Sequence, residues 1–158
     1  MRGFYAGSFD PFTNGHLAIV KKASQCFEKV IVGIGVNTDK KRRIDATEMK
    51  KAIEESIKQN EINNVDVVIY NGLTTEEAQK YNCTYLIRGL RNGTDYQYEE
   101  NIATINEEHS SIDTCYFRAG KLGYLSSSMV MELYKYGKTV EKYVPKPVLK
   151  ILEEKRKE

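Results

Sequence analysis

Short apolar runs alternate with amphipathic stretches along nearly the whole chain, and this alternation constrains the fold most strongly. Residues 30–36 are almost continuously apolar, as expected for a parallel strand that is covered on both faces. The pattern predicts further strands at residues 4–6, 65–70, 84–87 and 114–117, and helices at about 16–27, 47–59, 95–108, 126–136 and 148–157. Alternation at this spacing predicts right-handed βαβ crossovers, and therefore an α/β fold with a doubly wound parallel sheet.

Length and charge set broad limits on the class of protein. A chain of 158 residues fits one domain, residues 1–158, with a single core. The formal net charge of +2 is too small for bulk nucleic-acid binding, so any functional basicity must be local and no nucleic-acid partner is expected. The sequence shows no signal-peptide pattern and no apolar run of membrane-spanning length. We therefore expect a cytoplasmic protein that does not bind a membrane.

The three cysteines give no sign of a disulfide or zinc framework. Cys26, Cys83 and Cys115 are far apart, odd in number and without a Cys-x-x-Cys spacing. We expect them to be small buried side chains in a reducing compartment, and we expect no metal site built from protein ligands.

In a doubly wound sheet, ligands bind outside the carboxyl ends of the strands at a topological switch point. The residues with chemical potential follow four predicted strands, at positions 7–8, 37–43, 72–74 and 88–91. The carboxyl ends of parallel strands share one edge of the sheet, so one cleft is predicted to collect all four segments. Thr74 or Thr75 is the predicted cap of the helix after the third strand.

The turn at residues 7–16 reads Gly-Ser-Phe-Asp-Pro-Phe-Thr-Asn-Gly-His, directly after the first strand. A glycine- and hydroxyl-bearing turn before a helix offers backbone N–H donors to a phosphate, and His16 adds a switchable donor. The alternative is a plain strand–helix turn, with Asn14 as the helix cap and His16 in solvent.

Two basic clusters are candidates for the same cleft. The run at residues 40–43 is either a solvated loop or a cover over a polyphosphate. Arg88 and Arg91 flank Gly89 directly after a buried strand, where their planar guanidinium groups suit phosphate oxygens. The alternative for this pair is an ion pair with Asp95 or Glu99.

Two further patterns have less specific meanings. Consecutive serines at 126–128 either cap the following helix or also present hydroxyl and N–H groups to an anion. The Gly33-x-Gly35 pair is too incomplete for a dinucleotide fingerprint, so tight packing is the preferred interpretation and no function is assigned to it.

Taken together, these motifs resemble bacterial phosphopantetheine adenylyltransferases over almost the whole chain. The matching elements are the turn at 7–16, Lys40-Lys41, Ile-Arg-Gly-Leu-Arg at 87–91, Asp-Tyr-Gln-Tyr-Glu at 95–99, Asn106 and the serines at 126–128. The Thr-x-Gly-His element alone is similar to the wider nucleotidyltransferase superfamily. The resemblance implies a Rossmann-like nucleotidyltransferase fold, ATP and 4′-phosphopantetheine as substrates, Mg²⁺ as cofactor and a homohexamer. Coenzyme A as a feedback ligand is compatible with the same site.

The resemblance also implies roles for individual residues. His16 would stabilise the transition state, with Lys40 and Arg88 beside it at the reacting centre. The acceptor would contact Ser8, Lys40, Thr74 and Arg88. The nucleotide would contact Ser8, Phe9, His16, Gly89, Leu90, Arg91, Glu99, Tyr124, Leu125, Ser126, Ser127, Ser128, Met129 and Val130.

This sequence departs from the family pattern after the basic loop. The family usually has a proline, an aromatic residue and then a Glu-Arg pair, where this chain has Arg42-Arg43-Ile44 and Thr-Glu-Met-Lys at 47–50. Lys41 is therefore an alternative to Lys40 as the active lysine. Tyr124 stands where tryptophan is frequent and keeps an aromatic face.

The expected reaction is direct in-line attack of the acceptor phosphate on the α-phosphorus of ATP. An anionic acceptor needs positioning and charge stabilisation rather than a strong base or a covalent intermediate. Three alternatives remain: a nucleotidyltransferase for another phosphorylated acceptor, a non-catalytic nucleotide-binding module, and an RNA-binding protein, which the balanced charge disfavours.

Overall fold

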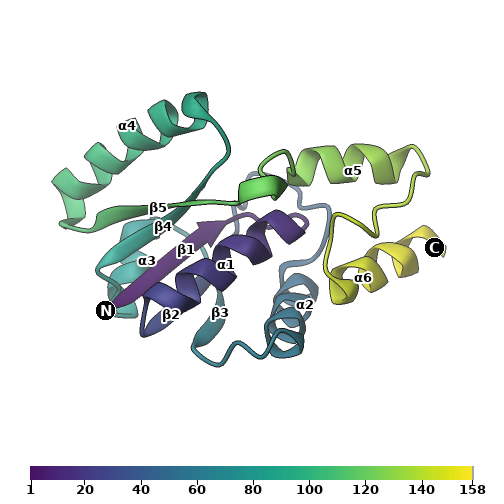
Figure 1. The fold of residues 1–158 in the computed structure, drawn as a ribbon, viewed down its shortest axis with the longest axis horizontal. Helices are drawn as coiled ribbons and strands as arrows, with labels where there is room; N and C mark the ends of the chain where they lie inside the picture. The colour runs from purple at the N-terminus through teal and green to yellow at the C-terminus, as the bar shows by residue number, and fades with distance from the viewer. Residues whose placement is uncertain (158) are drawn as a thin grey trace.

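The computed structural model describes residues 1–157 and contains one five-stranded parallel sheet (Figure 1). The strands are β1 (Arg2–Gly7), β2 (Lys29–Gly35), β3 (Val65–Tyr70), β4 (Tyr85–Leu90) and β5 (Asp113–Arg118). The helices are α1 (Asn14–Cys26), α2 (Ala46–Gln59), α3 (Thr74–Lys80), α4 (Gly93–Ser110), α5 (Ser127–Lys135) and α6 (Lys146–Lys157), with a short 3₁₀ helix η1 (Gly120–Leu122).

The strand order β3-β2-β1-β4-β5 confirms the predicted doubly wound sheet. The chain adds β2 and β3 on one side of β1, then crosses back and adds β4 and β5 on the other side. Phe4 of β1 pairs with Ile31 of β2 and with Leu86 of β4, all in parallel register. The order of the strands reverses at β1, so the topological switch point lies between β1 and β4.

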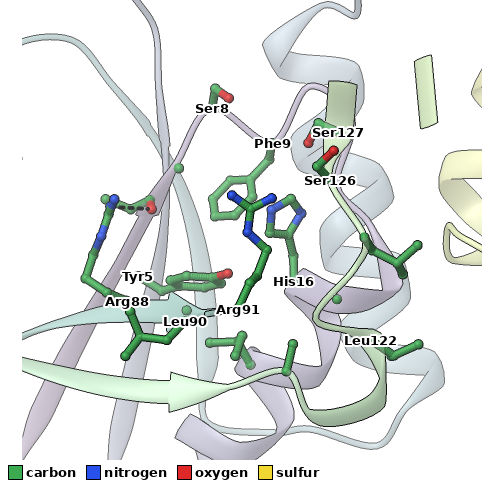
Figure 2. Close-up of a pocket in the computed structure, with 17 residues that line it drawn as sticks. Tyr5, Ser8, Phe9, His16, Arg88, Leu90, Arg91, Leu122, Ser126 and Ser127 are labelled. Atoms are coloured by element: carbon green, nitrogen blue, oxygen red, sulfur yellow. Dashed lines mark hydrogen bonds between the residues drawn. The ribbon is translucent and has the colours of Figure 1, made fainter. Parts of the chain in front are cut away.

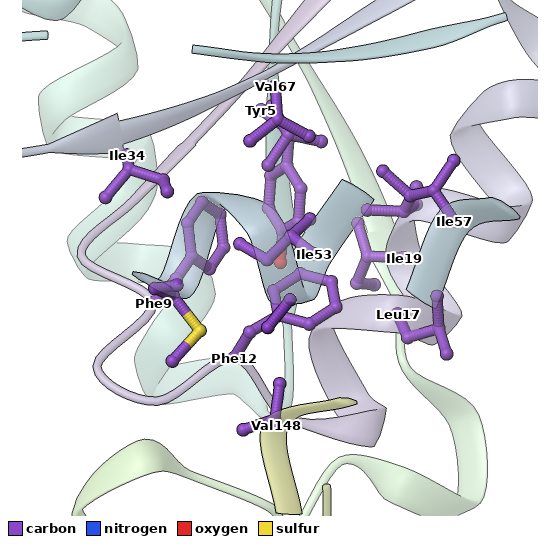
Figure 3. Close-up of a cluster of buried hydrophobic side chains, with 14 of the residues drawn as sticks. Tyr5, Phe9, Phe12, Leu17, Ile19, Ile34, Ile53, Ile57, Val67 and Val148 are labelled. Carbon is purple, nitrogen blue, oxygen red and sulfur yellow. The ribbon is translucent and has the colours of Figure 1, made fainter. Parts of the chain in front are cut away.

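Alternate side chains of the central strands enter two separate cores. Tyr5, Val32 and Ile87 join the larger core, which α1, α2, α5 and α6 help to cover (Figure 3). Phe4 and Leu86, one residue along, join a smaller core beneath α3. Burial on both faces explains why these strands read as continuous apolar runs.

The Gly33-x-Gly35 pair in β2 does create tight packing, as expected from the sequence. The ring of Phe4 lies over Gly33 and meets the ring of Tyr70 edge to face, with the centroids 5.6 Å apart. A Cβ atom on Gly33 would lie 2.5 Å from Phe4 Cε1, and one on Gly35 would lie 3.2 Å from the Tyr70 hydroxyl. The two glycines therefore form a slot for two aromatic rings.

Several predicted boundaries and environments are wrong. The strand predicted at 84–87 continues through Leu90, so Arg88 and Gly89 lie inside β4. Helix α3 is capped by Leu73 without a side-chain hydrogen bond, so neither Thr74 nor Thr75 is its cap. Cys26 is exposed at the end of α1, whereas Cys83 is buried as expected.

The last helix contributes to the core although many of its residues are charged. Val148 and Leu152 of α6 are buried, and α6 packs against α2 beside the larger core (Figure 1). The charged residues occupy its other face, which is the usual arrangement for an amphipathic surface helix. Across residues 1–157, no helix combines the length and the apolar composition that crossing a membrane requires.

Candidate active site

A cavity of about 300 Å³ lies at the switch point between β1 and β4 (Figure 2). We call it the switch-point pocket. Side chains and backbone from β1, the following turn, α1, β4 and the segment before α5 surround it. Its lining residues are Tyr5, Ala6, Gly7, Ser8, Phe9, Gly15, His16, Ile19, Arg88, Gly89, Leu90, Arg91, Ala119, Leu122, Leu125, Ser126 and Ser127.

The turn after β1 forms the floor of this pocket. Phe9 is buried with a φ of 45°, and its ring folds back over Gly7, where a Cβ would lie 2.8 Å from it. Thr13, rather than Asn14, caps α1 by accepting from the His16 N–H. Backbone atoms therefore line the pocket directly in front of the helix N-terminus, which is a favourable setting for an anion.

His16 completes an unusual capping box in which an imidazole takes the place of the common glutamate. The Thr13 N–H donates to Nδ1 of His16 at 3.0 Å, so Nδ1 carries a lone pair and the proton of the neutral ring is on Nε2. The rings of Phe9 and Phe12 pack against the imidazole, with centroids 5.1 and 5.6 Å away. Burial, with a smaller contribution from Arg91, lowers the pKa of His16 to about 4. His16 is thus a neutral hydrogen-bond donor near pH 7.

This lowered pKa predicts a pH dependence of stability. The unfolded chain takes up a proton on His16 near pH 6.5, whereas the folded chain takes it up only near a pKa of about 4. The free energy of unfolding should therefore fall as the pH decreases from 6.5 to about 4. Urea unfolding at pH 7 and pH 5 should show a smaller loss for His16→Asn than for the wild type. Equal losses would contradict the assignment.

Two arginines from β4 and its end enter the site, and both are held by carboxylates of α4. Arg88 donates from Nε and Nη2 to the two oxygens of Glu99 at 2.6 and 2.7 Å. Its Nη1 donates to the Ala6 carbonyl (Figure 2). Arg91 makes a similar pair with Asp95 at 2.8 and 3.2 Å. The predicted ion pairs are therefore present, and both arginines also line the pocket, where their binding of phosphate oxygens stays a prediction.

The N-terminus of α5 closes the pocket opposite the arginines. Ser126 caps the helix by accepting from the Met129 N–H at 3.1 Å. Ser127 donates to the carbonyl of Pro11 at 2.8 Å, which ties α5 to the turn after β1. Both serines line the pocket, whereas Ser128 faces a different surface hollow.

A second cavity of about 320 Å³ adjoins the first, because Ala6 and Arg88 line both. We call it the α4 pocket. Apolar side chains form much of its wall, and Thr74, Glu99 and Asn106 supply polar groups. Its lining residues are Ala6, Gly72, Leu73, Thr74, Thr75, Leu86, Arg88, Glu99, Ile102, Ala103, Asn106 and Thr114. The two cavities together form a cleft with Arg88 at its centre.

The basic run lines neither cavity. Lys40 and Lys41 are exposed on the loop before α2. Asp10 holds the end of this loop by accepting from the backbone N–H groups of Arg43 and Ile44, at 2.8 and 2.9 Å. Of the two alternatives for this run, the structure shows an exposed loop, and the roles of Lys40 and Lys41 stay predictions.

Comparison with known proteins places the chain in a family. A family profile described as cytidylyltransferase-like matches residues 4–133. The phosphopantetheine adenylyltransferase of Leuconostoc mesenteroides is 42% identical over 96% of this chain and 93% of that protein. The enzyme of the same name from Streptococcus pneumoniae strain Taiwan19F-14 is 38% identical over 99% of this chain and 97% of that protein. The chain belongs to the phosphopantetheine adenylyltransferase family. It is therefore a nucleotidyltransferase, as the motifs suggested.

A solved structure supports the fold assignment. The crystal structure of a candidate nicotinate-nucleotide adenylyltransferase from Vibrio parahaemolyticus superposes with a TM-score of 0.72. The superposition covers 96% of this chain and 97% of the Vibrio chain. Sequence identity is 16%, so the likeness concerns the fold alone.

The structure brings most of the predicted site residues of this adenylyltransferase family member into the cleft. The switch-point pocket collects Ser8, Phe9, His16, Arg88, Gly89, Leu90, Arg91, Leu125, Ser126 and Ser127, and the α4 pocket collects Thr74 and Glu99. Lys40, Tyr124, Ser128, Met129 and Val130 line neither pocket. Ser128 and Tyr124 are exposed, and Val130 belongs to the core.

Sequence reasoning missed Tyr5 and Asp10. Tyr5 lines the switch-point pocket, where burial raises the pKa of its phenol and keeps it a neutral donor. It had the appearance of an ordinary apolar strand residue. Asp10 joins the turn to a loop 33 residues further along the chain, and no local pattern signals that contact.

Proposed function

We propose that this chain transfers the adenylyl group of ATP to 4′-phosphopantetheine, giving dephospho-coenzyme A and pyrophosphate. The observation that carries the proposal is the cleft of two adjoining pockets with Arg88 between them. A reaction that joins two anionic substrates needs two neighbouring sites and a cation where they meet. The names of the relatives supply the identity of the acceptor.

In the proposed reaction, an oxygen of the acceptor phosphate attacks the α-phosphorus while the bond to the bridging oxygen of the β-phosphate breaks. Pyrophosphate leaves directly, without an enzyme-bound intermediate. His16 Nδ1 is occupied by the Thr13 N–H, so the ring has no lone pair to act as a base. Its Nε2–H can instead donate to the oxygens that gain charge in the transition state.

The remaining polar groups neutralise and position the phosphates. Arg88 would hold the acceptor phosphate, while Arg91 and the N-terminus of α5 would face the triphosphate. To do so, each arginine must exchange part of its carboxylate pairing for phosphate oxygens. The bidentate contacts with Glu99 and Asp95 keep the guanidinium groups ordered until then.

Mg²⁺ fits this donor set as a partner of ATP rather than of a protein cage. In residues 1–157, no group of three or more His, Cys, Asp or Glu side chains could hold a metal ion. Mg²⁺ commonly keeps several waters and binds through substrate phosphates. We infer that Mg²⁺ enters the cleft bound to ATP and offsets the negative charge of its phosphates. The arginines and backbone N–H groups then orient these phosphates.

Incubation with Mg-ATP and a panel of phosphorylated acceptors tests the reaction. We expect pyrophosphate and dephospho-coenzyme A to form with 4′-phosphopantetheine, and far slower turnover with the other acceptors. Turnover with a different acceptor alone would favour the related nucleotidyltransferase. Tight ATP binding without turnover of any acceptor would favour a non-catalytic module.

We also infer a cytoplasmic homohexamer that binds coenzyme A as a feedback ligand. All three cysteines are free thiols, which suits a reducing compartment. Helix α4 has no buried residue and exposes Tyr96, Tyr98 and Ile105, a surface that subunit contacts would cover. Light scattering should give six times the chain mass of 18.1 kDa.

Coenzyme A resembles the product and should compete with 4′-phosphopantetheine for the cleft.

A further inference from the structure

The glycine slot of β2 holds a tyrosine whose hydroxyl points to the acceptor side of the cleft. The Tyr70 ring is wedged against Phe4 and above Gly33 and Gly35, and only 9% of the residue is exposed. Its hydroxyl lies 2.7 Å from Oγ1 of Thr74. Tyr70 lines neither pocket, whereas Thr74 lines the α4 pocket. The tyrosine thus stands directly behind a site residue.

The Thr74 side chain does not cap helix α3. Threonine in the first turn of a helix commonly serves as or near a cap, but α3 has no side-chain capping hydrogen bond. The Thr74 hydroxyl bonds to Tyr70 instead. This hydrogen bond holds the Thr74 side chain in one rotamer at the wall of the α4 pocket.

The direction of this hydrogen bond matters for what Thr74 can offer. Either hydroxyl could donate, but a phenol is a stronger donor than an aliphatic hydroxyl, which favours Tyr70 O–H as the donor and Thr74 Oγ1 as the acceptor. Burial raises the pKa of Tyr70, which keeps its proton in place at working pH. The Thr74 proton is then free to be donated to an acceptor atom in the pocket, such as an amide carbonyl oxygen.

We infer that Tyr70 is a positioning residue for the acceptor substrate and acts through Thr74. The inference rests on the proposed function, in which the α4 pocket receives the phosphopantetheine arm with its amide groups. Tyr70 holds the Thr74 hydroxyl in one orientation, so that a bound amide meets a preorganised donor. The Gly33-x-Gly35 pair thereby gains an indirect role, because it makes the space in which Tyr70 is fixed.

Steady-state kinetics of Tyr70→Phe test this role, because the change removes the hydroxyl and keeps the ring in its slot. We expect KM for 4′-phosphopantetheine to rise about three- to tenfold, the range that one neutral hydrogen bond contributes. KM for ATP and kcat should stay within about twofold of the wild type, since Arg91 and His16 are untouched. Thr74→Val should raise the same KM by a similar or larger factor.

The double variant Tyr70→Phe/Thr74→Val separates a positioning role from independent contacts. If Tyr70 acts through Thr74, the double variant should be no worse than Thr74→Val alone. Tyr81→Phe is the matched control, because Tyr81 also packs near Phe4, at 6.4 Å between centroids, but lines neither pocket. Its kinetics should match the wild type, and thermal unfolding should show that all variants are folded.

Three outcomes would overturn the inference. These are an unchanged KM for the acceptor in Tyr70→Phe, multiplicative effects in the double variant, or an equal loss in Tyr81→Phe. A wild-type enzyme that uses 4′-phosphopantetheine while Tyr70→Phe is normal would refute the positioning role alone. A wild-type enzyme that does not use this acceptor would refute the proposed function and the inference with it.

Discussion

Replacing His16 with alanine is expected to lower kcat by about 100- to 1000-fold, the usual effect of removing one donor to a developing oxyanion. KM for ATP should change by less than about threefold, because the imidazole contributes mainly as charge develops in the transition state. The large effect on kcat is expected because the neutral imidazole carries one proton that it can donate. The Thr13 N–H donates to Nδ1, so this proton is on Nε2. Steady-state kinetics with both substrates varied provide the measurement.

The matched control is His109→Ala, which removes the other histidine of the chain from an exposed position near the end of α4. It should leave kcat and both KM values unchanged. An equal loss of kcat and ATP affinity in His16→Ala would instead show that His16 serves ground-state binding. A near-normal rate would remove it from the chemistry altogether.

Gly33→Ala is expected to cause the largest loss of stability among single glycine changes. Its Cβ would lie 2.5 Å from Phe4 Cε1 and closer still to Cζ, and 3.1 Å from Tyr70 Cε1. Both rings are buried between the sheet and α3, so neither can move aside without opening the smaller core. Overpacking of this kind costs about 1–3 kcal/mol and occasionally more. For a domain of this size, that lowers Tm by roughly 2–12 °C.

Gly93→Ala is the control for this prediction. Gly93 is the first residue of α4, and no atom lies within 4 Å of where its Cβ would be. Alanine is the better helix former, so Tm should stay the same or rise slightly. If Gly33→Ala unfolds at the wild-type temperature in differential scanning calorimetry, the proposed slot for Phe4 and Tyr70 does not constrain the fold.

The doubly wound parallel sheet could be predicted because the residues that form its core follow local patterns in the sequence. Apolar runs such as residues 30–36 and 65–70 need both faces covered, and the helical stretches between them supply the cover. The predicted end of β4 was wrong because its side chains change from buried apolar residues to residues that line the cleft. β4 runs on through Arg88 because its backbone keeps pairing with β5 although its side chains become polar.

The features of the site that could not be predicted from the sequence depend on contacts that local sequence patterns do not reveal. Asp10, in the turn after β1, accepts hydrogen bonds from Arg43 and Ile44 at the end of the loop that carries Lys40. Thr74 or Thr75 was expected to cap α3, but neither does, and the Thr74 hydroxyl forms a hydrogen bond with Tyr70 instead. The arginine motif was compatible with an ion pair or an anion site, and the structure shows the ion pairs with Glu99 and Asp95 at the wall of the switch-point pocket.

The stereochemical course at the α-phosphorus tests the central claim most directly. In the proposed reaction, the two anionic substrates bind side by side, and the acceptor oxygen attacks as pyrophosphate leaves. ATP made chiral at the α-phosphorus by sulfur substitution and incubated with 4′-phosphopantetheine should therefore give a product of inverted configuration. Net retention would reveal two successive displacements and an enzyme-bound adenylyl group, which contradicts direct transfer in this cleft.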